Sequence, residues 1–148
     1  MDKLVFSDEY FMKEALKEAQ KAFDKDEVPI GAVIVCNNRV IARAFNLTER
    51  LNDVTAHAEM QAITAAQNYL GAKYLEECSL YVTLEPCPMC AGAAYWSRIA
   101  RLIYGAGDPK KGYSLISSAL LHKKTEVKTG LLEKECIDLL KNFFQKKR

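Results

Sequence analysis

One histidine and two cysteines carry the strongest chemical signal in this sequence. Cys87 and Cys90 are three positions apart, and His57 lies thirty residues before Cys87. Thiolate and imidazole groups are preferred ligands of zinc. Structural zinc sites usually take four protein ligands, whereas catalytic sites take three and leave one position to water. The three residues therefore predict a catalytic zinc site, at which the pKa of a bound water can fall to about 7.

A carboxylate follows the histidine at Glu59. Residues two apart do not share one face of a continuous helix, so His57 is expected to open a helix with Glu59 in its first turn. Thr55 is the expected cap of that helix. A carboxylate beside an activated water can take up and return protons. Glu59 is therefore predicted to be the acid/base group and not a metal ligand.

Each half of this pattern has other interpretations when taken alone. Cys-x-x-Cys is also typical of redox pairs and of half a structural zinc site, and His-x-Glu occurs by chance. A redox function would leave His57 and Glu59 without a role. Residues 57–59 and 86–90 together match H-x-E…P-C-x-x-C, the signature of zinc-dependent nucleobase deaminases.

Over nearly its whole length the sequence resembles the bacterial tRNA-specific adenosine deaminases of the cytidine-deaminase-like superfamily. The matching stretches are residues 27–33, 46, 55–59, 80–87, 90–93, 97–98 and 105–108. The resemblance implies hydrolysis of adenosine to inosine at the wobble position of a tRNA anticodon, with one Zn²⁺ per subunit. It also implies a cytoplasmic homodimer that binds the tRNA anticodon stem-loop.

The same resemblance suggests further site residues. It implies that Asn46 hydrogen-bonds the substrate base and that Asp108 lies near the ribose, although both are also common turn formers. The residues expected to line the substrate pocket, or to serve in packing alone, are Pro29, Ile30, Ala58, Leu84 and Pro86. The expected RNA contacts are Lys110, Lys111, Phe143, Phe144, Lys146, Lys147 and Arg148. The two phenylalanines could equally close the core beneath the last helix.

A second substrate class stays open. Tyr95-Trp96, close to Cys90, is also similar to guanine and nucleoside deaminases of the superfamily. The segment after Asp108 is shorter than in many tRNA deaminases. The alternative is therefore a free-base or nucleoside deaminase, of the guanine, cytosine or cytidine type, with the same zinc site. A non-enzymatic zinc-binding module is a third possibility.

Length and composition predict one soluble domain over residues 1–148. The net charge of +2 is divided unevenly, with −2 in residues 1–74 and +4 in residues 75–148. This C-terminal excess is compatible with phosphate contacts but does not require them. Five cysteines are too few for a disulfide scaffold, and no apolar run or leader pattern indicates a membrane or secreted protein. A cytoplasmic protein is expected.

The expected elements alternate between helices and strands. A helix starts at Ser7 or Asp8, and residues 33–36 and 39–42 form a hairpin around Asn37-Asn38. A helix from His57 to Gly71, strands at 79–83, 101–105 and 125–128, and helices after Cys87 and over 131–144 complete the pattern. This order predicts an α/β fold, a three-layer α/β/α sandwich with a five-stranded mixed sheet.

The other candidate ligands are expected to be structural. Cys36 is predicted to be a small buried hydrophobe, and Asp53 a local turn or capping residue. Cys78, Cys136 and His122 are interpreted as structural or surface residues, because a fourth zinc ligand among them would contradict a catalytic site.

Overall fold

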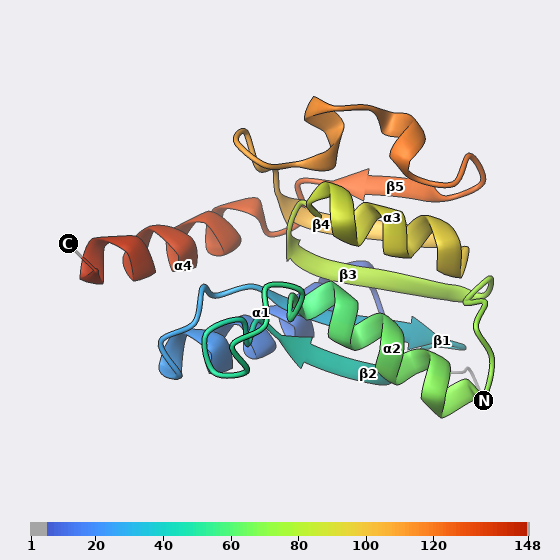
Figure 1. Cartoon of the computed structure of the whole chain (residues 1–148), viewed down its shortest axis with the longest axis horizontal. Helices are drawn as coiled ribbons and strands as arrows, with labels where there is room; N and C mark the ends of the chain where they lie inside the picture. Colours follow the sequence, from blue (N-terminus) through green and yellow to red (C-terminus); the bar gives the residue numbers. More distant parts are fainter. Residues whose placement is uncertain (1–5, 148) are drawn as a thin grey trace.

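A five-stranded sheet in the order β2-β1-β3-β4-β5 forms the middle layer (Figure 1). The structure, a computed structural model, describes residues 6–147. Its strands are β1 (Gly31–Cys36), β2 (Arg39–Phe45), β3 (Cys78–Leu84), β4 (Arg101–Ala106) and β5 (Glu126–Thr129). Its helices are α1 (Asp8–Asp24), α2 (Ala58–Leu70), α3 (Pro88–Ser97) and α4 (Glu133–Lys146), with short 3-10 helices η1 (Tyr113–Leu115) and η2 (Ser118–Leu120).

The sheet is mixed, as expected. β1 pairs antiparallel with β2 and β3, whereas β4 pairs parallel with β3 and β5. The β1–β2 hairpin turns at Asn37 and Asn38, whose φ angles are +52° and +60°. Two positive φ angles suit the twist of a two-residue hairpin, and Asn tolerates them. The parallel pairing of β3 and β4 follows from the helical crossover α3 between them.

Helices cover both faces of the sheet, which confirms the three-layer prediction. Figure 1 shows α2 and α3 over the near face and α1 behind the sheet. Alternate residues of β1 divide between these faces, because Ala32 and Ile34 pack under α2 and α3 while Val33 and Val35 pack on α1. Within residues 6–147, no helix combines the length and the apolar character needed to cross a membrane.

The helix ends agree with the sequence except at one cap. Ser7 caps α1, with its hydroxyl accepting from the Tyr10 N–H at 3.1 Å. Gly71 ends α2 in the left-handed conformation, at φ +64°. The expectation that Thr55 caps α2 is wrong, because the N-cap residue is His57. Thr55 instead donates its N–H and its hydroxyl to the Asp53 carboxylate, which confirms a local turn role for Asp53.

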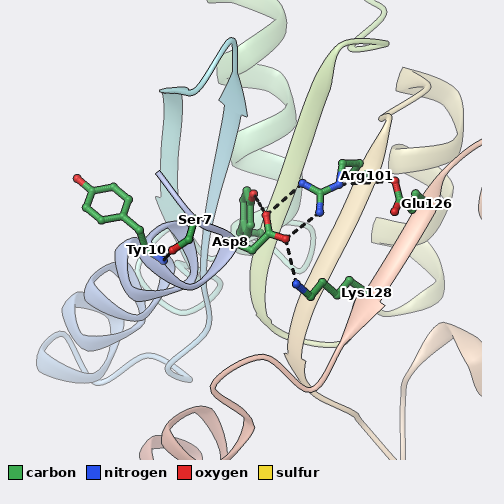
Figure 2. Close-up of polar contacts among 7 residues, drawn as sticks. Ser7, Asp8, Tyr10, Arg101, Glu126 and Lys128 are labelled. Atoms are coloured by element: carbon green, nitrogen blue, oxygen red, sulfur yellow. Dashed lines mark hydrogen bonds and ion pairs between the residues drawn. The ribbon is translucent and has the colours of Figure 1, made fainter. Parts of the chain in front are cut away.

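Asp8 ties the start of α1 to three strands (Figure 2). Its carboxylate accepts two hydrogen bonds from Arg101, at 3.1 and 2.9 Å, one from Lys128 at 3.2 Å and one from the Tyr81 hydroxyl at 2.5 Å. These donors stand on β4, β5 and β3. The hydrogen bonds from Arg101 in particular hold the pKa of Asp8 well below its usual value. The ionised carboxylate therefore stabilises the folded state.

We expect Asp8→Asn to lower the free energy of unfolding by about 1–3 kcal/mol at pH 7, since hydrogen bonds to a charged acceptor are lost. The folded pKa lies below the unfolded value near 3.8, so this contribution is complete above pH 3.8, starts to decrease below it, and is lost as the pH falls through the folded pKa. Urea unfolding of both proteins between pH 3 and 7 measures the difference, which should shrink with acidification.

Glu126→Gln is the matched control. Glu126 also faces Arg101, at 3.8 Å, but its side chain is 75% exposed, so its loss should change stability by less than about 1 kcal/mol. A pH-independent loss in Asp8→Asn would contradict the electrostatic explanation.

Candidate metal and catalytic site

The three predicted metal ligands meet where α2 and α3 begin. His57 is the N-cap residue of α2, and Cys87 is the N-cap residue of α3. Neither side chain caps its own helix. Instead, the Nδ1 atom of His57 lies 3.7 Å from the sulfur of Cys87 and 3.5 Å from that of Cys90. The structure thus brings together the three residues that the sequence singled out.

Two neighbouring residues replace the missing side-chain caps. The side-chain oxygen of Asn46 accepts from the Ala58 N–H at 2.9 Å, which satisfies one unpaired donor in the first turn of α2. In α3 the first helical residue is Pro88, which has no N–H to satisfy and a φ suited to that position. His57 and Cys87 are therefore free to face each other.

The spacing of the ligand atoms fits a tetrahedral cation. Zinc with Zn–S bonds of about 2.3 Å and a Zn–N bond of about 2.05 Å holds sulfur and nitrogen roughly 3.6 Å apart. The distances of 3.5 and 3.7 Å agree with that value. Within residues 6–147 this is the one group of three or more possible ligands, and all its donor atoms lie within 4.8 Å of one another. Cys78, Cys136 and His122 do not belong to it.

Proton positions in the cluster are set by the same short contacts. Hydrogen bonds from Cys90 and His57 lower the pKa of the Cys87 thiol to about 4. The contact with Cys87, and burial, raise the pKa of Cys90. Contact with Cys87 also raises the pKa of His57. The lowered pKa favours a thiolate at Cys87, and binding of a cation would release the proton that Cys90 keeps.

Glu59 is buried beside this cluster, in the first turn of α2. Its residue is 3% exposed, and its Oε1 atom has no hydrogen-bond partner among the described residues. Burial raises the pKa of Glu59 to about 7, while the positive charge of His57 opposes that shift. A buried polar atom without a partner is costly and uncommon in folded proteins. The orphaned oxygen indicates that Glu59 is arranged for a group that arrives with the substrate or the metal.

Comparison with known proteins identifies the family. A model of the MafB19-like deaminases matches residues 6–148. A tRNA-specific adenosine deaminase of Bacillus subtilis is 51% identical over 146 residues, which cover 95% of this chain and 91% of the relative. One from Aquifex aeolicus is 47% identical, with 95% of each chain covered. The chain belongs to the tRNA-specific adenosine deaminase family.

Solved structures agree with this assignment and confirm the fold. A chain from a study of A-to-I editing by tRNA:A34 deaminases at the wobble position of transfer RNA superposes with a TM-score of 0.82 and 49% identity. The superposition covers 88% of this deaminase and 99% of the other chain. A guanine deaminase from Nitrosomonas europaea superposes with a TM-score of 0.84 at 25% identity, covering 95% and 86% of the two chains. The core architecture is thus shared with deaminases that act on a free base.

The residues expected to line the deaminase pocket divide by exposure. Asn46, Pro29, Ala58 and Pro86 are buried, whereas Ile30 and Leu84 are half-buried. Hydrogen bonds bring part of this set together. The Asn46 N–H donates to the Ile30 carbonyl at 3.1 Å, and the Asn46 side-chain oxygen accepts from the Ala58 N–H. Among the described residues the side-chain amide nitrogen of Asn46 has no hydrogen bond in the structure. Contact with a base remains a prediction for all six residues.

Asp108 organises a turn beside the site. Its Oδ1 atom accepts from the N–H groups of Lys110 and Lys111, each at 3.0 Å. This is the turn role that the sequence allowed, and contact with a ribose remains a prediction. Both lysines are exposed, and the positive charge of Lys111 is close enough to oppose protonation of His57. Lys111 therefore stands at the edge of the catalytic cluster.

The C-terminal aromatic and basic residues lie against α1. Phe143 is 4% exposed and packs edge-on against Phe23, which favours its packing role over contact with RNA. Phe144 is half-exposed. Lys147 pairs with Asp26 at 2.5 Å, and Lys146 lies over the ring of Phe23. The predicted contact at Arg148 lies outside the described residues.

Two of the buried glutamates that the sequence analysis did not single out hold loops beside the site. Glu85 is 5% exposed, and its carboxylate accepts from the Asp108 N–H at 3.0 Å and from the N–H and hydroxyl of Ser114 at 3.0 and 2.7 Å. Gly112 packs so closely that an added Cβ would lie 2.3 Å from this carboxylate. Glu27 holds the loop before α2 in the same way, accepting from Glu49 and Arg50 N–H groups at 3.1 and 2.8 Å.

We expect Glu85→Gln to loosen residues 107–115, because an amide has one acceptor oxygen in place of two and adds a buried donor. The free energy of unfolding should fall by about 1.5–3 kcal/mol. Limited trypsin digestion should cleave faster after Lys110 and Lys111. Ser114→Ala removes one of the three bonds and should give a smaller effect. Unchanged cleavage in Glu85→Gln would show that the loop does not depend on this carboxylate.

Proposed function

We propose that this deaminase converts adenosine to inosine at the wobble position of a tRNA anticodon, with zinc held by His57, Cys87 and Cys90. The observation that carries the proposal is the buried carboxylate of Glu59, whose Oε1 atom has no hydrogen-bond partner among the described residues, beside two sulfurs and an imidazole. Identity of 42–51% to tRNA-specific adenosine deaminases over nearly the whole chain supports the choice of substrate.

The net reaction consumes one water and releases one ammonia. Zinc, when bound, would lower the pKa of water to about 7 and so supply a nucleophile at neutral pH. Glu59 accepts a proton from the attacking water and delivers it to the ring nitrogen beside the amino-bearing carbon of adenine. Glu59 then moves the proton of the hydroxyl added to that carbon onto the amino group, the C–N bond breaks with release of ammonia, and the carbon keeps its oxygen as a carbonyl. Glu59 is suited to this task because no group within residues 6–147 competes for its Oε1 atom.

Neighbouring residues would hold the base and the ribose. The side-chain oxygen of Asn46 is engaged by Ala58, so its amide nitrogen is the group that can donate to a base nitrogen. Pro29, Ile30, Leu84 and Pro86 would provide apolar walls around the ring. Asp108 uses one oxygen for its own turn, and the other is available to accept from a ribose hydroxyl.

RNA binding would draw on positive charge near the site. A base in an anticodon loop has to be turned out of its stack to reach a buried catalytic group. Lys110 and Lys111 are the exposed cations beside the cluster and are proposed to contact phosphate. Phe144, Lys146 and Lys147 could extend this contact.

A homodimer is part of the proposal. Trp96 is 77% exposed and Tyr95 is 37% exposed on α3. The two rings contact each other, and exposed clusters of large aromatic side chains are typical of an interface, so α3 is the proposed contact between subunits. Sedimentation of the purified chain would distinguish a dimer from a monomer.

A second candidate is deamination of free guanine. The overlap with the Nitrosomonas europaea guanine deaminase, at a TM-score of 0.84, favours it specifically. The two candidate substrates predict different effects of salt on binding. Binding of a stem-loop RNA releases counterions and weakens steeply as salt rises, whereas binding of a neutral base does not.

The deciding experiment measures inosine formation on an anticodon stem-loop RNA with adenosine at the wobble position. Free adenosine, cytidine and guanine are assayed in parallel. We expect reaction with the RNA alone, and Glu59→Gln should lower kcat by at least about 100-fold, since proton transfer is lost while shape is kept. Zinc content measured by mass spectrometry should stay at about one per chain in that variant. Deamination of guanine without reaction on RNA would reject the proposed substrate.

We expect Cys87→Ser and Cys90→Ser each to lose most of the zinc and the activity, because a neutral hydroxyl is a much poorer zinc ligand than a thiolate. Cys36→Ser serves as the matched control, since Cys36 is half-buried and lies outside the ligand group. Zinc is quantified by mass spectrometry after dialysis against a weak chelator. Full zinc occupancy in both site variants would refute the ligand assignment.

A further inference from the structure

A second pair of thiols lies outside the catalytic cluster. Cys36 ends β1 and Cys78 begins β3, and the two residues stand directly opposite each other in the antiparallel ladder. We propose that Cys36 and Cys78 form a dithiol site that reacts with hydroperoxides and closes into a cross-strand disulfide.

The backbone geometry suits such a bond. The N–H of Cys78 donates to the Leu75 carbonyl at 3.1 Å, and its carbonyl accepts from the Ala100 N–H at 3.0 Å. The N–H and the carbonyl of Cys78 therefore point away from β1, so Cys36 and Cys78 are a non-hydrogen-bonded pair of the antiparallel ladder. The Cα atoms of such a pair lie about 4.5 Å apart. Disulfides span Cα separations of about 4.4–6.8 Å, so the bond can form without moving either strand.

Both side chains are on the same face of the sheet. Cys78 belongs to the core beneath α2 and α3, and Cys36 packs against that core from its edge. Burial, followed by a hydrogen bond to Cys36, raises the pKa of the Cys78 thiol to about 12. Cys78 is therefore in contact with Cys36 and remains a thiol at neutral pH.

Access to solvent differs between the two sulfurs. Cys36 lines a cavity of about 260 Å³ together with Asn37, Arg39, Ile41, Tyr69 and Leu70. Cys78 is 1% exposed. The cavity is several times the volume of a water molecule, about 30 Å³, and so admits a small hydroperoxide. An oxidant therefore reaches Cys36 first, and Cys78 reacts only through it.

The chemistry balances in two steps. The Cys36 thiolate attacks one peroxide oxygen and breaks the O–O bond, which gives a sulfenic acid and, with hydrogen peroxide, one water. The Cys78 sulfur then attacks the Cys36 sulfur, loses its proton, and displaces the hydroxyl as a second water. Two thiols supply the two electrons that reduce the peroxide. The net products are one disulfide and two waters.

The bond would enclose a functional part of the chain. The closed segment, residues 36–78, contains both His57 and Glu59. The metal-binding sulfurs of Cys87 and Cys90 follow the opposite end of β3, beyond Leu84. A cross-link over a loop of this length restricts the unfolded chain and stabilises the fold. Oxidation is therefore expected to stabilise the protein without removing its metal ligands.

The test uses the zinc-loaded wild-type protein titrated with hydrogen peroxide. We expect loss of two alkylatable thiols, retention of zinc, and a tryptic cross-link between the peptides that contain Cys36 and Cys78. Fragment ions are needed, because Cys87 and Cys90 share the tryptic peptide 74–98 with Cys78. The Tm should rise by about 5–10 °C and return on reduction.

Two variants report on the order of events. In Cys78→Ser the Cys36 sulfenic acid should persist and react with dimedone, whereas in Cys36→Ser the buried Cys78 should stay reduced. The proposal is overturned if the first oxidised pair in the wild-type protein is Cys87–Cys90 with release of zinc. It is equally overturned if wild-type Cys36 passes to the sulfinic acid, or stays reduced, without forming the bond to Cys78.

Discussion

The catalytic cluster depends on two helices that begin at the same place. His57 and Cys87 are the N-cap residues of α2 and α3, and both have extended backbone. α2 precedes β3 and α3 follows it on the same face of the sheet, so both helix N-termini lie near the end of β3. The positive ends of two helix dipoles favour thiolate sulfur at this point. The two N-cap side chains thus face each other as candidate metal ligands, and neither caps its own helix.

Glu27, Glu85 and Glu59 are buried near the site and differ in their hydrogen-bond partners. Glu27 and Glu85 are 1% and 5% exposed, and backbone N–H groups engage both oxygens of each carboxylate. Each one fixes a loop beside the site. Glu59 is equally buried, yet one of its oxygens has no partner among the described residues. Native proteins rarely leave a buried polar atom without a partner, so Glu59 differs from Glu27 and Glu85 in a way that packing of the loops does not explain.

The features that sequence predicted well are those with a local cause. Asn37-Asn38 indicates a hairpin, Gly71 ends a helix, and the 57–59 and 87–90 patterns identify three side chains that the structure brings together, because each pattern depends on a few adjacent residues. Thr55 failed as a cap because α2 begins at Ala58 with His57 as its N-cap, and Thr55 belongs to the preceding turn, where it donates to Asp53. The roles of Glu27 and Glu85 depend on partners 22–29 residues away, and the pairing of Cys36 with Cys78 depends on strand register. Neither is visible in a local pattern.

The sheet and its helices do not by themselves determine the substrate. A guanine deaminase overlaps this chain with a TM-score of 0.84 at only 25% identity, so the fold accommodates more than one kind of base. Discrimination between an RNA and a free base must then come from the segments around the cluster. Here those segments are the loop before α2, held by Glu27, and residues 107–115, held by Glu85. The buried carboxylates hold these loops from the inner side, and Lys110 and Lys111 remain exposed on the outer side.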